Sequence, residues 1–270
     1  MSILQKIVDH KRKETEERKR LYPLELLQKS IHYNAPCVSL KQYVKRPDKS
    51  GIIAEFKRKS PSKGNINPYA EVEKISIGYM QAGASALSVL TDQTFFGGSN
   101  EDLKTARKFN YCPILRKDFI VDEYQVYEAK AIGADAILLI AAVLSQKEIQ
   151  QMTRLAHNLG MEVLLEFYAE EELKKYIPEA DLAGINNRNL KDFSVNFDHA
   201  IGMARRLPAE SIKIAESGIR RPEDILLLKE AGFDGFLIGE LFMRAVSPET
   251  ACRDFIRDLR RLQQINKTRK

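Results

Sequence analysis

The chain has 270 residues, 44% of them hydrophobic, which suits one large globular domain and excludes a disordered protein. Its longest apolar run, Ala136 to Leu144, is far shorter than the ~20 residues that a membrane-spanning helix needs, so no membrane association is expected. Three widely separated cysteines form no CxxC pair, and the N-terminus has no apolar export signal. We therefore expect a cytoplasmic protein with no disulfide framework and no metal site.

The net charge of +6 is concentrated near the C-terminus, where Arg257 to Lys270 contains six Lys or Arg residues and one Asp. No nucleic-acid-binding motif interleaves with these charges. We interpret the segment as a solvated helix end followed by a frayed tail, and we expect no nucleic-acid partner.

From Gly51 onward, short apolar segments alternate with longer amphipathic ones. Most of the short segments are continuously apolar, which is typical of parallel strands covered on both faces. Ser145 to Glu148 reads as a capping box, and Pro222 and Pro248 suit the first turn of a helix. The eight predicted strands are Ile52–Phe56, Ala84–Leu90, Cys112–Arg116, Ala136–Ile140, Glu162–Glu166, Leu182–Ile185, Ile212–Ala215 and Gly235–Ile238.

Eight strand–helix units favour an α/β fold made of a single (β/α)₈ TIM barrel over an open sheet. No GxGxxG follows the first strand, which also argues against a dinucleotide-binding domain. We divide the chain into an N-terminal helical extension (1–48), a catalytic barrel (49–260) and a basic tail (261–270). Ile3, Leu4, Ile7 and Val8 form an apolar helical stripe in the extension, and Pro23–Leu27 suggests a second short helix. The extension either packs on the barrel or caps its active-site mouth.

Polar residues follow the predicted strands at the end where barrel enzymes place their catalytic groups. Strand alternation puts Glu55 and Lys57 on one face, pointing into the mouth, with Phe56 outward. Burying many charges at one rim is costly unless they pair with one another or bind a ligand. We favour a functional site, with a layer of structural salt bridges as the alternative. The other strand-end residues are Lys117, Asp118, Glu166, Asn186, Arg188, Glu216 and Glu240.

Small residues follow the last two strands, where barrels commonly bind phosphate through backbone N–H groups. These residues are Ser217, Gly218 and Gly239. Tight turns leaving the strands would explain them equally well, but their position favours a phosphate site. The four histidines lie away from the strand ends, so we interpret them as surface or packing residues with no metal-ligand spacing.

Seven ordered segments of the chain closely resemble indole-3-glycerol-phosphate synthases. The extension also resembles the N-terminal cap of that family, so the likeness covers about residues 1–260. The segments are AEFKRKSPSKG (54–64), LSVLTD (87–92), FFGGS (95–99), LRKDFI (115–120), GINNRNL (184–190), AESGI (215–219) and LIGE (237–240).

The resemblance implies a cofactor-free reaction of tryptophan biosynthesis. A phosphosugar–anthranilate substrate, 1-(2-carboxyphenylamino)-1-deoxyribulose 5-phosphate, would cyclise, lose CO₂ and lose water to give indole-3-glycerol phosphate. Lys117 would be the general acid, Lys57 would hold the carboxylate, and Glu166 would act in the dehydration. Glu55 would organise Lys117 or the substrate nitrogen. The residues expected to bind substrate are Asn186, Arg188, Glu216, Ser217, Phe96 and Phe119, and those expected to bind phosphate are Ser60, Gly218, Gly239 and Glu240.

Three further expectations follow from the same residues. A carboxylate beside a phosphate would repel it, so we expect the Glu240 side chain to point away while backbone amides bind the anion. The loop Arg58–Ile66, with its basic residues, Pro61 and Gly64, suggests a mobile lid. No exposed apolar stripe stands out, so we expect a monomer.

Two alternatives remain open from the sequence. Another phosphosugar barrel enzyme, such as a Schiff-base aldolase that uses Lys117, would place the same residue types at the mouth. A catalytically silent barrel could instead act as a binding scaffold, with its basic tail contacting nucleic acid in a salt-dependent way.

Overall fold

In the computed structural model, residues 2–188 and 194–268 are described. Eight parallel strands close into a barrel, and each strand pairs with the next barrel strand along the chain. The barrel closes where Ile53 of the first strand lies opposite Leu237 of the last. The strands are β1 (Ile52–Phe56), β4 (Ala86–Leu90), β5 (Ile114–Lys117), β6 (Ala136–Ile140), β7 (Glu162–Phe167), β8 (Leu182–Asn186), β9 (Lys213–Glu216) and β10 (Gly235–Ile238).

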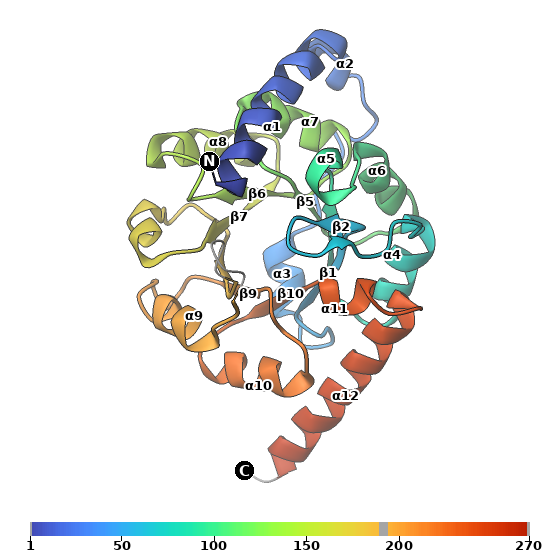
Figure 1. Cartoon of the computed structure of the whole chain (residues 1–270), viewed down its shortest axis with the longest axis vertical. Helices are drawn as coiled ribbons and strands as arrows, with labels where there is room; N and C mark the ends of the chain where they lie inside the picture. Colours follow the sequence, from blue (N-terminus) through green and yellow to red (C-terminus); the bar gives the residue numbers. More distant parts are fainter. Residues whose placement is uncertain (1, 189–193, 269–270) are drawn as a thin grey trace.

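Helices form a ring around the strands (Figure 1). After β7 the covering element is a 3₁₀ helix, η1 (Glu170–Lys175), rather than an α-helix. Two short helices lie in loops at the mouth, α5 (Gln93–Phe96) and α11 (Glu240–Met243). The long helices of the ring are α4 (Val72–Gln81), α6 (Asn100–Phe109), α7 (Glu123–Ala131), α8 (Gln146–Asn158), α9 (Phe197–Ala204), α10 (Pro222–Glu230) and α12 (Pro248–Thr268).

Strand alternation divides the apolar residues into two cores. Outward-facing residues such as Ile52 and Phe56 pack against the helices. Inward-facing residues such as Ile53, Leu115 and Ile214 fill the barrel. The predicted outward position of Phe56 is therefore confirmed. At the carboxyl ends of the strands, the inward-facing positions carry polar side chains.

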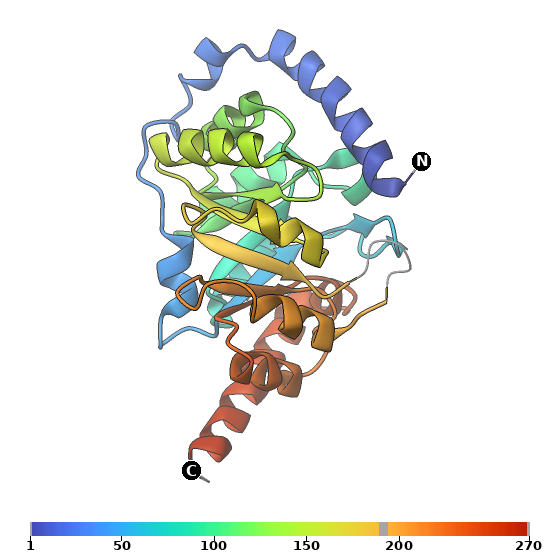
Figure 2. The same cartoon turned by 90° about the vertical axis from the view of Figure 1, so that its left-hand side faces the viewer.

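The N-terminal extension reaches both ends of the barrel. It contains α1 (Ile3–Leu21), α2 (Leu24–Leu27) and α3 (Leu40–Lys45). Figure 2 places the start of α1 near the hairpin of β2 (Lys59–Ser60) and β3 (Gly64–Asn65), and α3 on the opposite side of the molecule. Leu40 and Val44 of α3 are buried against the inner barrel core, so α3 closes the end opposite the mouth. The sequence suggested that the extension plugs the barrel or packs on it, but it did not predict α3.

Most local predictions agree with the structure. All eight strands are present within two residues of their predicted starts and ends, the Ser145–Glu148 capping box is formed, and α10 and α12 begin at Pro222 and Pro248. The loop predicted at 58–66 contains an unforeseen two-stranded hairpin, β2 (Lys59–Ser60) with β3 (Gly64–Asn65).

The basic C-terminal segment also differs from expectation, because α12 continues to Thr268. Residues 261–268 are therefore the last turns of a helix and not a frayed tail, while 269–270 lie outside the described residues. Asn189 and Leu190 of the GINNRNL segment lie outside them too. Among the described residues, no helix is long and apolar enough to cross a membrane.

Candidate active site

A pocket opens at the carboxyl ends of the barrel strands, and nearly all predicted site residues line it. The exception is Glu166, which is fully buried and lies behind Lys117. The predicted residues in the pocket wall are Glu55, Lys57, Ser60, Phe96, Lys117, Phe119, Asn186, Arg188, Glu216, Ser217, Gly218, Gly239 and Glu240.

Lys117, the last residue of β5, reaches the centre of the pocket between two carboxylates from other strands. Its Nζ lies 2.6 Å from Oε2 of Glu166 and 2.9 Å from Oε2 of Glu216. Asn186 Nδ2 donates to the other oxygen of Glu166 at 3.2 Å. Burial alone would lower the pKa of Lys117, but the carboxylates of Glu166, Glu216 and Glu55 raise it overall, so Lys117 is an ammonium ion at neutral pH.

The pKa values of the two carboxylates around Lys117 are shifted in opposite directions. Burial raises the pKa of both, but the ion pair and hydrogen bond with Lys117 bring that of Glu166 below its usual range. The pKa of Glu216 is raised by burial and by the neighbouring Glu166 charge. The three charged groups therefore titrate together, and Glu216 holds its proton to higher pH than Glu166 does.

Glu55 and Lys57 form a second ion pair across the pocket. Lys57 Nζ lies 2.5 Å from Oε1 of Glu55, and both side chains are largely buried. The structure therefore pairs Glu55 with Lys57 directly, whereas we expected Glu55 to organise Lys117 or the substrate nitrogen. Its charge still contributes to the raised pKa of Lys117.

One wall of the pocket is apolar and aromatic. The rings of Phe96 and Phe119 lie with their centroids 5.8 Å apart and an angle of 38° between their planes. Ile3, Leu4 and Ile7 of α1 line the same pocket, which supports the cap interpretation of the extension. This wall suits a flat aromatic group beside the charged residues.

The loops after β9 and β10 bring backbone close to the pocket. Ser217 has a φ of 69° and Gly218 a φ of 77°, so two successive residues adopt the left-handed conformation. Gly239 lies so close to the Glu55 side chain that a Cβ atom would overlap it. Ser60 is also buried in the pocket wall. These features fit an anion held by backbone N–H groups.

Arg188 and Glu240 form an ion pair at the rim of this corner. Arg188 Nη2 lies 3.0 Å from Oε2 of Glu240, and the Arg188 backbone N–H donates to Asn186 Oδ1 at 3.0 Å. The Glu240 carboxylate therefore has a cationic partner within the chain. In the described ranges, no cluster of His, Cys, Asp and Glu could hold a metal ion, and no histidine lines the pocket.

Sequence reasoning missed two contributors to this site. Tyr168 lines the pocket two residues beyond Glu166, and the pKa of its hydroxyl is raised by burial and by the Glu166 charge. Strand alternation places Tyr168 on the same face as Glu166, which is the signal that could have found it. The second is Lys11 of α1, a buried lysine for which no local pattern gave a signal.

Comparison with known proteins identifies the family. The family model described as indole-3-glycerol phosphate synthase matches residues 4–255. An indole-3-glycerol phosphate synthase from Bacteroides thetaiotaomicron is 48% identical over 255 residues, covering 94% of this chain and 98% of that protein. Another, from Carboxydothermus hydrogenoformans, is 42% identical and covers 92% of this chain and 97% of that protein.

Solved structures resemble the fold at much lower identity. A tryptophan synthase alpha subunit from Legionella pneumophila has a TM-score of 0.60 and 13% identity, covering 82% of this chain and 97% of that one. The 3-hexulose-6-phosphate synthase from Salmonella typhimurium has a TM-score of 0.62 and 15% identity, with 78% and 98% covered. These two support the barrel fold alone. The sequence matches, which span almost the whole chain, show that it belongs to the indole-3-glycerol phosphate synthase family.

Proposed function

We propose how the residues of this pocket perform indole-3-glycerol phosphate synthesis. The chain is a decarboxylating lyase of tryptophan biosynthesis by its family. The substrate is 1-(2-carboxyphenylamino)-1-deoxyribulose 5-phosphate, and the products are indole-3-glycerol phosphate, CO₂ and water. The observation that carries the proposal is the position of Lys117, whose ammonium lies 2.6 Å from Glu166 and 2.9 Å from Glu216 beside an aromatic wall.

Ring closure comes first. The aromatic carbon that bears the carboxylate attacks the ribulose carbonyl, and the carbonyl oxygen takes a proton from Lys117. Lys57 holds the substrate carboxylate until it leaves as CO₂, when its bonding electrons restore the aromatic ring. Phe96 and Phe119 hold the anthranilate ring during these steps.

Dehydration follows. A proton leaves the new ring as the hydroxyl group departs as water, with Glu166 as the acid–base group and Lys57 as a second proton donor. Glu166 does not line the pocket, so we propose that it acts through Lys117 and Asn186, which contact both it and the cavity. Glu55 keeps Lys57 in place.

The remaining pocket residues bind the sugar and its phosphate. Asn186, Glu216 and Ser217 position the ribulose hydroxyls, while Ser60, the Gly218 and Gly239 backbones and the Glu240 N–H hold the phosphate. The Glu240 side chain stays paired with Arg188, and Arg188 adds positive charge near the substrate. A bound anion in contact with the Glu240 carboxylate would contradict this assignment.

The direct test is formation of indole-3-glycerol phosphate from synthetic substrate, followed by indole fluorescence. Turnover without any added metal or cofactor is expected. A protein that gives no product but is trapped on Lys117 by borohydride with a phosphosugar would instead be a Schiff-base aldolase. Binding of nucleic acid that weakens steeply with salt, without turnover, would favour the scaffold alternative.

We propose that residues 1–48 act as an extension of the catalytic barrel of residues 49–260, with 261–270 as a basic end. We also propose that the protein works as a cytoplasmic monomer. Light scattering coupled to gel filtration measures the mass, and a dimer at micromolar concentration would contradict the monomer.

A further inference from the structure

Few side chains of helix α1 are fully buried, although Arg18, Lys19 and His10 also contact the barrel. Of its 19 residues the buried ones are Ile7, Val8, Lys11 and Thr15. Lys11 is the unusual member, because only 2% of its side chain is exposed on a helix whose other lysines and arginines reach solvent. A buried ammonium is costly unless several anions surround it.

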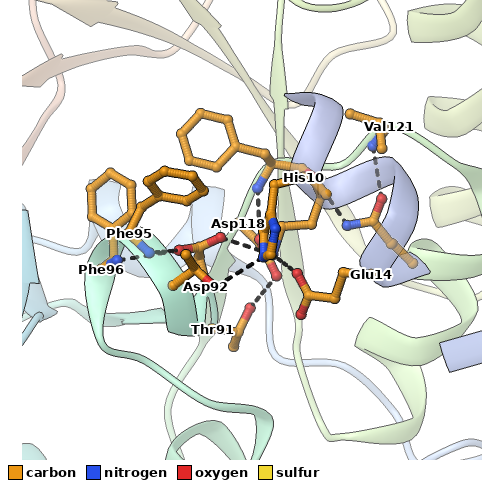
Figure 3. Close-up of polar contacts among 12 residues, drawn as sticks. His10, Glu14, Thr91, Asp92, Phe95, Phe96, Asp118 and Val121 are labelled. Carbon is orange, nitrogen blue, oxygen red and sulfur yellow. Dashed lines mark hydrogen bonds and ion pairs between the residues drawn. The ribbon is translucent and has the colours of Figure 1, made fainter. Parts of the chain in front are cut away.

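Three carboxylates surround Lys11, two of them from the barrel. Its Nζ lies 2.9 Å from Oδ2 of Asp92 and 3.1 Å from Oδ1 of Asp118, and Glu14 of α1 contributes at 2.7 Å (Figure 3). Burial opposes the charge on Lys11, but Asp118, Asp92 and Glu14 outweigh it and raise the pKa of the ammonium. Lys11 therefore links the extension, as a permanent cation, to the adjoining ends of β4 and β5.

Each barrel carboxylate also binds the backbone of an aromatic residue in the pocket. Asp92 Oδ1 accepts from the N–H groups of Phe95 at 2.7 Å and Phe96 at 3.2 Å, which caps α5. Asp118 Oδ1 accepts from the N–H group of Phe119 at 2.8 Å. Figure 3 shows Phe95 and Phe96 beside Asp92, with Asp118 and Glu14 close to it. The two rings of the aromatic wall are thus fixed by the two carboxylates that one ammonium holds.

The two carboxylates depend on Lys11 to different degrees. Asp118 has further partners, with Thr91 Oγ1 at 2.6 Å and Arg116 Nη2 at 3.1 Å. Among the ion pairs of the described residues, Lys11 is the only cation beside Asp92, which is fully buried. Removing Lys11 would therefore leave the Asp92 charge unpaired at the start of α5.

We propose that Lys11 is a positioning residue that shapes the aromatic half of the substrate pocket. It fixes Phe96 and Phe119 through Asp92 and Asp118, and it holds Ile3, Leu4 and Ile7 of its own helix over the same wall. The proposal rests on the proposed function, because it assigns this wall to the anthranilate ring. The phosphate corner, formed by the loops after β9 and β10, contains none of these contacts.

The test compares Lys11→Met with Lys13→Met, since Lys13 is an exposed lysine on the same helix. Calorimetric titration measures binding of indole-3-glycerol phosphate, which has a ring, and of glycerol 3-phosphate, which has none. For Lys11→Met we expect about 10-fold weaker binding of the first ligand and less than 2-fold change for the second. KM should rise by a similar factor with kcat within about 3-fold, and Lys11→Arg should restore most of the affinity. Lys13→Met should match the wild type.

Equally weaker binding of both ligands, or no change in the binding of either, would overturn the proposal. A purely structural residue would not discriminate between the aromatic wall and the phosphate corner of the pocket. If Lys11→Met does not fold, Asp92→Asn provides the same test. Its amide oxygen can still cap α5 while the ion pair is weakened, so about 3-fold selective loss of the aromatic ligand is expected. A wild type that binds the product but does not convert the substrate would contradict the proposed function and leave this test intact.

Discussion

The N-terminal extension covers both ends of the barrel, but it does so with opposite chemistry. At the mouth, α1 is attached through the buried charge of Lys11 and places apolar side chains over an open, charged pocket. At the other end, α3 inserts Leu40 and Val44 into the inner core, where they belong to the same buried cluster as Ile53 and Leu115.

The anchoring of α3 also differs from that of α1. Glu162 at the start of β7 accepts from Ser39 Oγ at 2.6 Å and from the Lys41 N–H at 2.8 Å, so a carboxylate binds the helix N-terminus. One extension therefore performs two tasks. Apolar contacts close the end that needs only stability, while charged contacts shape the end that needs a ligand site.

The largest expected effect is on activity at the mouth. Lys117→Ala should lower kcat by roughly 10³-fold, because it removes the proposed general acid. Glu166 and Glu216 can share a proton in its absence, so the variant should remain folded by circular dichroism. Product fluorescence measures the rate. A loss below about 10-fold would move the acid role to Lys57 or Glu166.

The next largest effect is a loss of stability that we expect to be larger at the closed end of the barrel than at its mouth. Leu40→Ala at the closed end should lower the free energy of unfolding by about 2–5 kcal/mol, because it leaves a cavity in the inner core, with KM unchanged at 25 °C. Urea denaturation measures the first quantity and initial rates the second. The matched control is Leu4→Ala, a half-buried leucine of the pocket wall, which should raise KM at a smaller cost in stability. Equal changes of unfolding free energy and KM in the two variants would mean that the two ends of the barrel do not differ in this way.

A third effect appears in the pH dependence of the mouth. The pKa of Glu216 is raised by burial and by Glu166, so it keeps its proton at pH values where an ordinary glutamate is ionised. As the pH rises through the raised pKa of Glu216, about 8, Glu216 loses its proton. The pocket then gains a negative charge beside Glu166 and repels the anionic substrate. Wild-type kcat/KM should therefore fall on the basic side, and Glu216→Gln should flatten that limb. An unchanged basic limb in the variant would assign it to another group.

The smallest effect is expected from an exposed ion pair at the closed end. Lys41 Nζ lies 2.8 Å from Oδ1 of Asp181, but 44% of the lysine side chain is exposed, so solvent screens the pair. Lys41→Met should change the free energy of unfolding by less than about 1 kcal/mol and leave the kinetics unchanged. A larger loss would mean that charge as well as apolar contact holds α3 in place.

The sequence was sufficient to predict the barrel and most of its mouth. Parallel strands buried on both faces are continuously apolar, so β1 and β6 could be located to the residue. The polar residue that ends each apolar run then marks the mouth, which is how Lys117, Asn186 and Glu216 were identified.

Pairing within the site was decided by the tertiary structure. Lys117 and Glu216 are 99 residues apart, and only barrel closure brings their side chains together. The same holds for Lys11, which looks like one more lysine in a charged helix until Asp92 and Asp118 surround it. Hydrophobic periodicity records which face of an element is buried, but it carries no information on which distant element covers that face. The sequence by itself therefore determined the strands and the residue types at the mouth, whereas the closure of the barrel decided which charges meet and which helix closes each end.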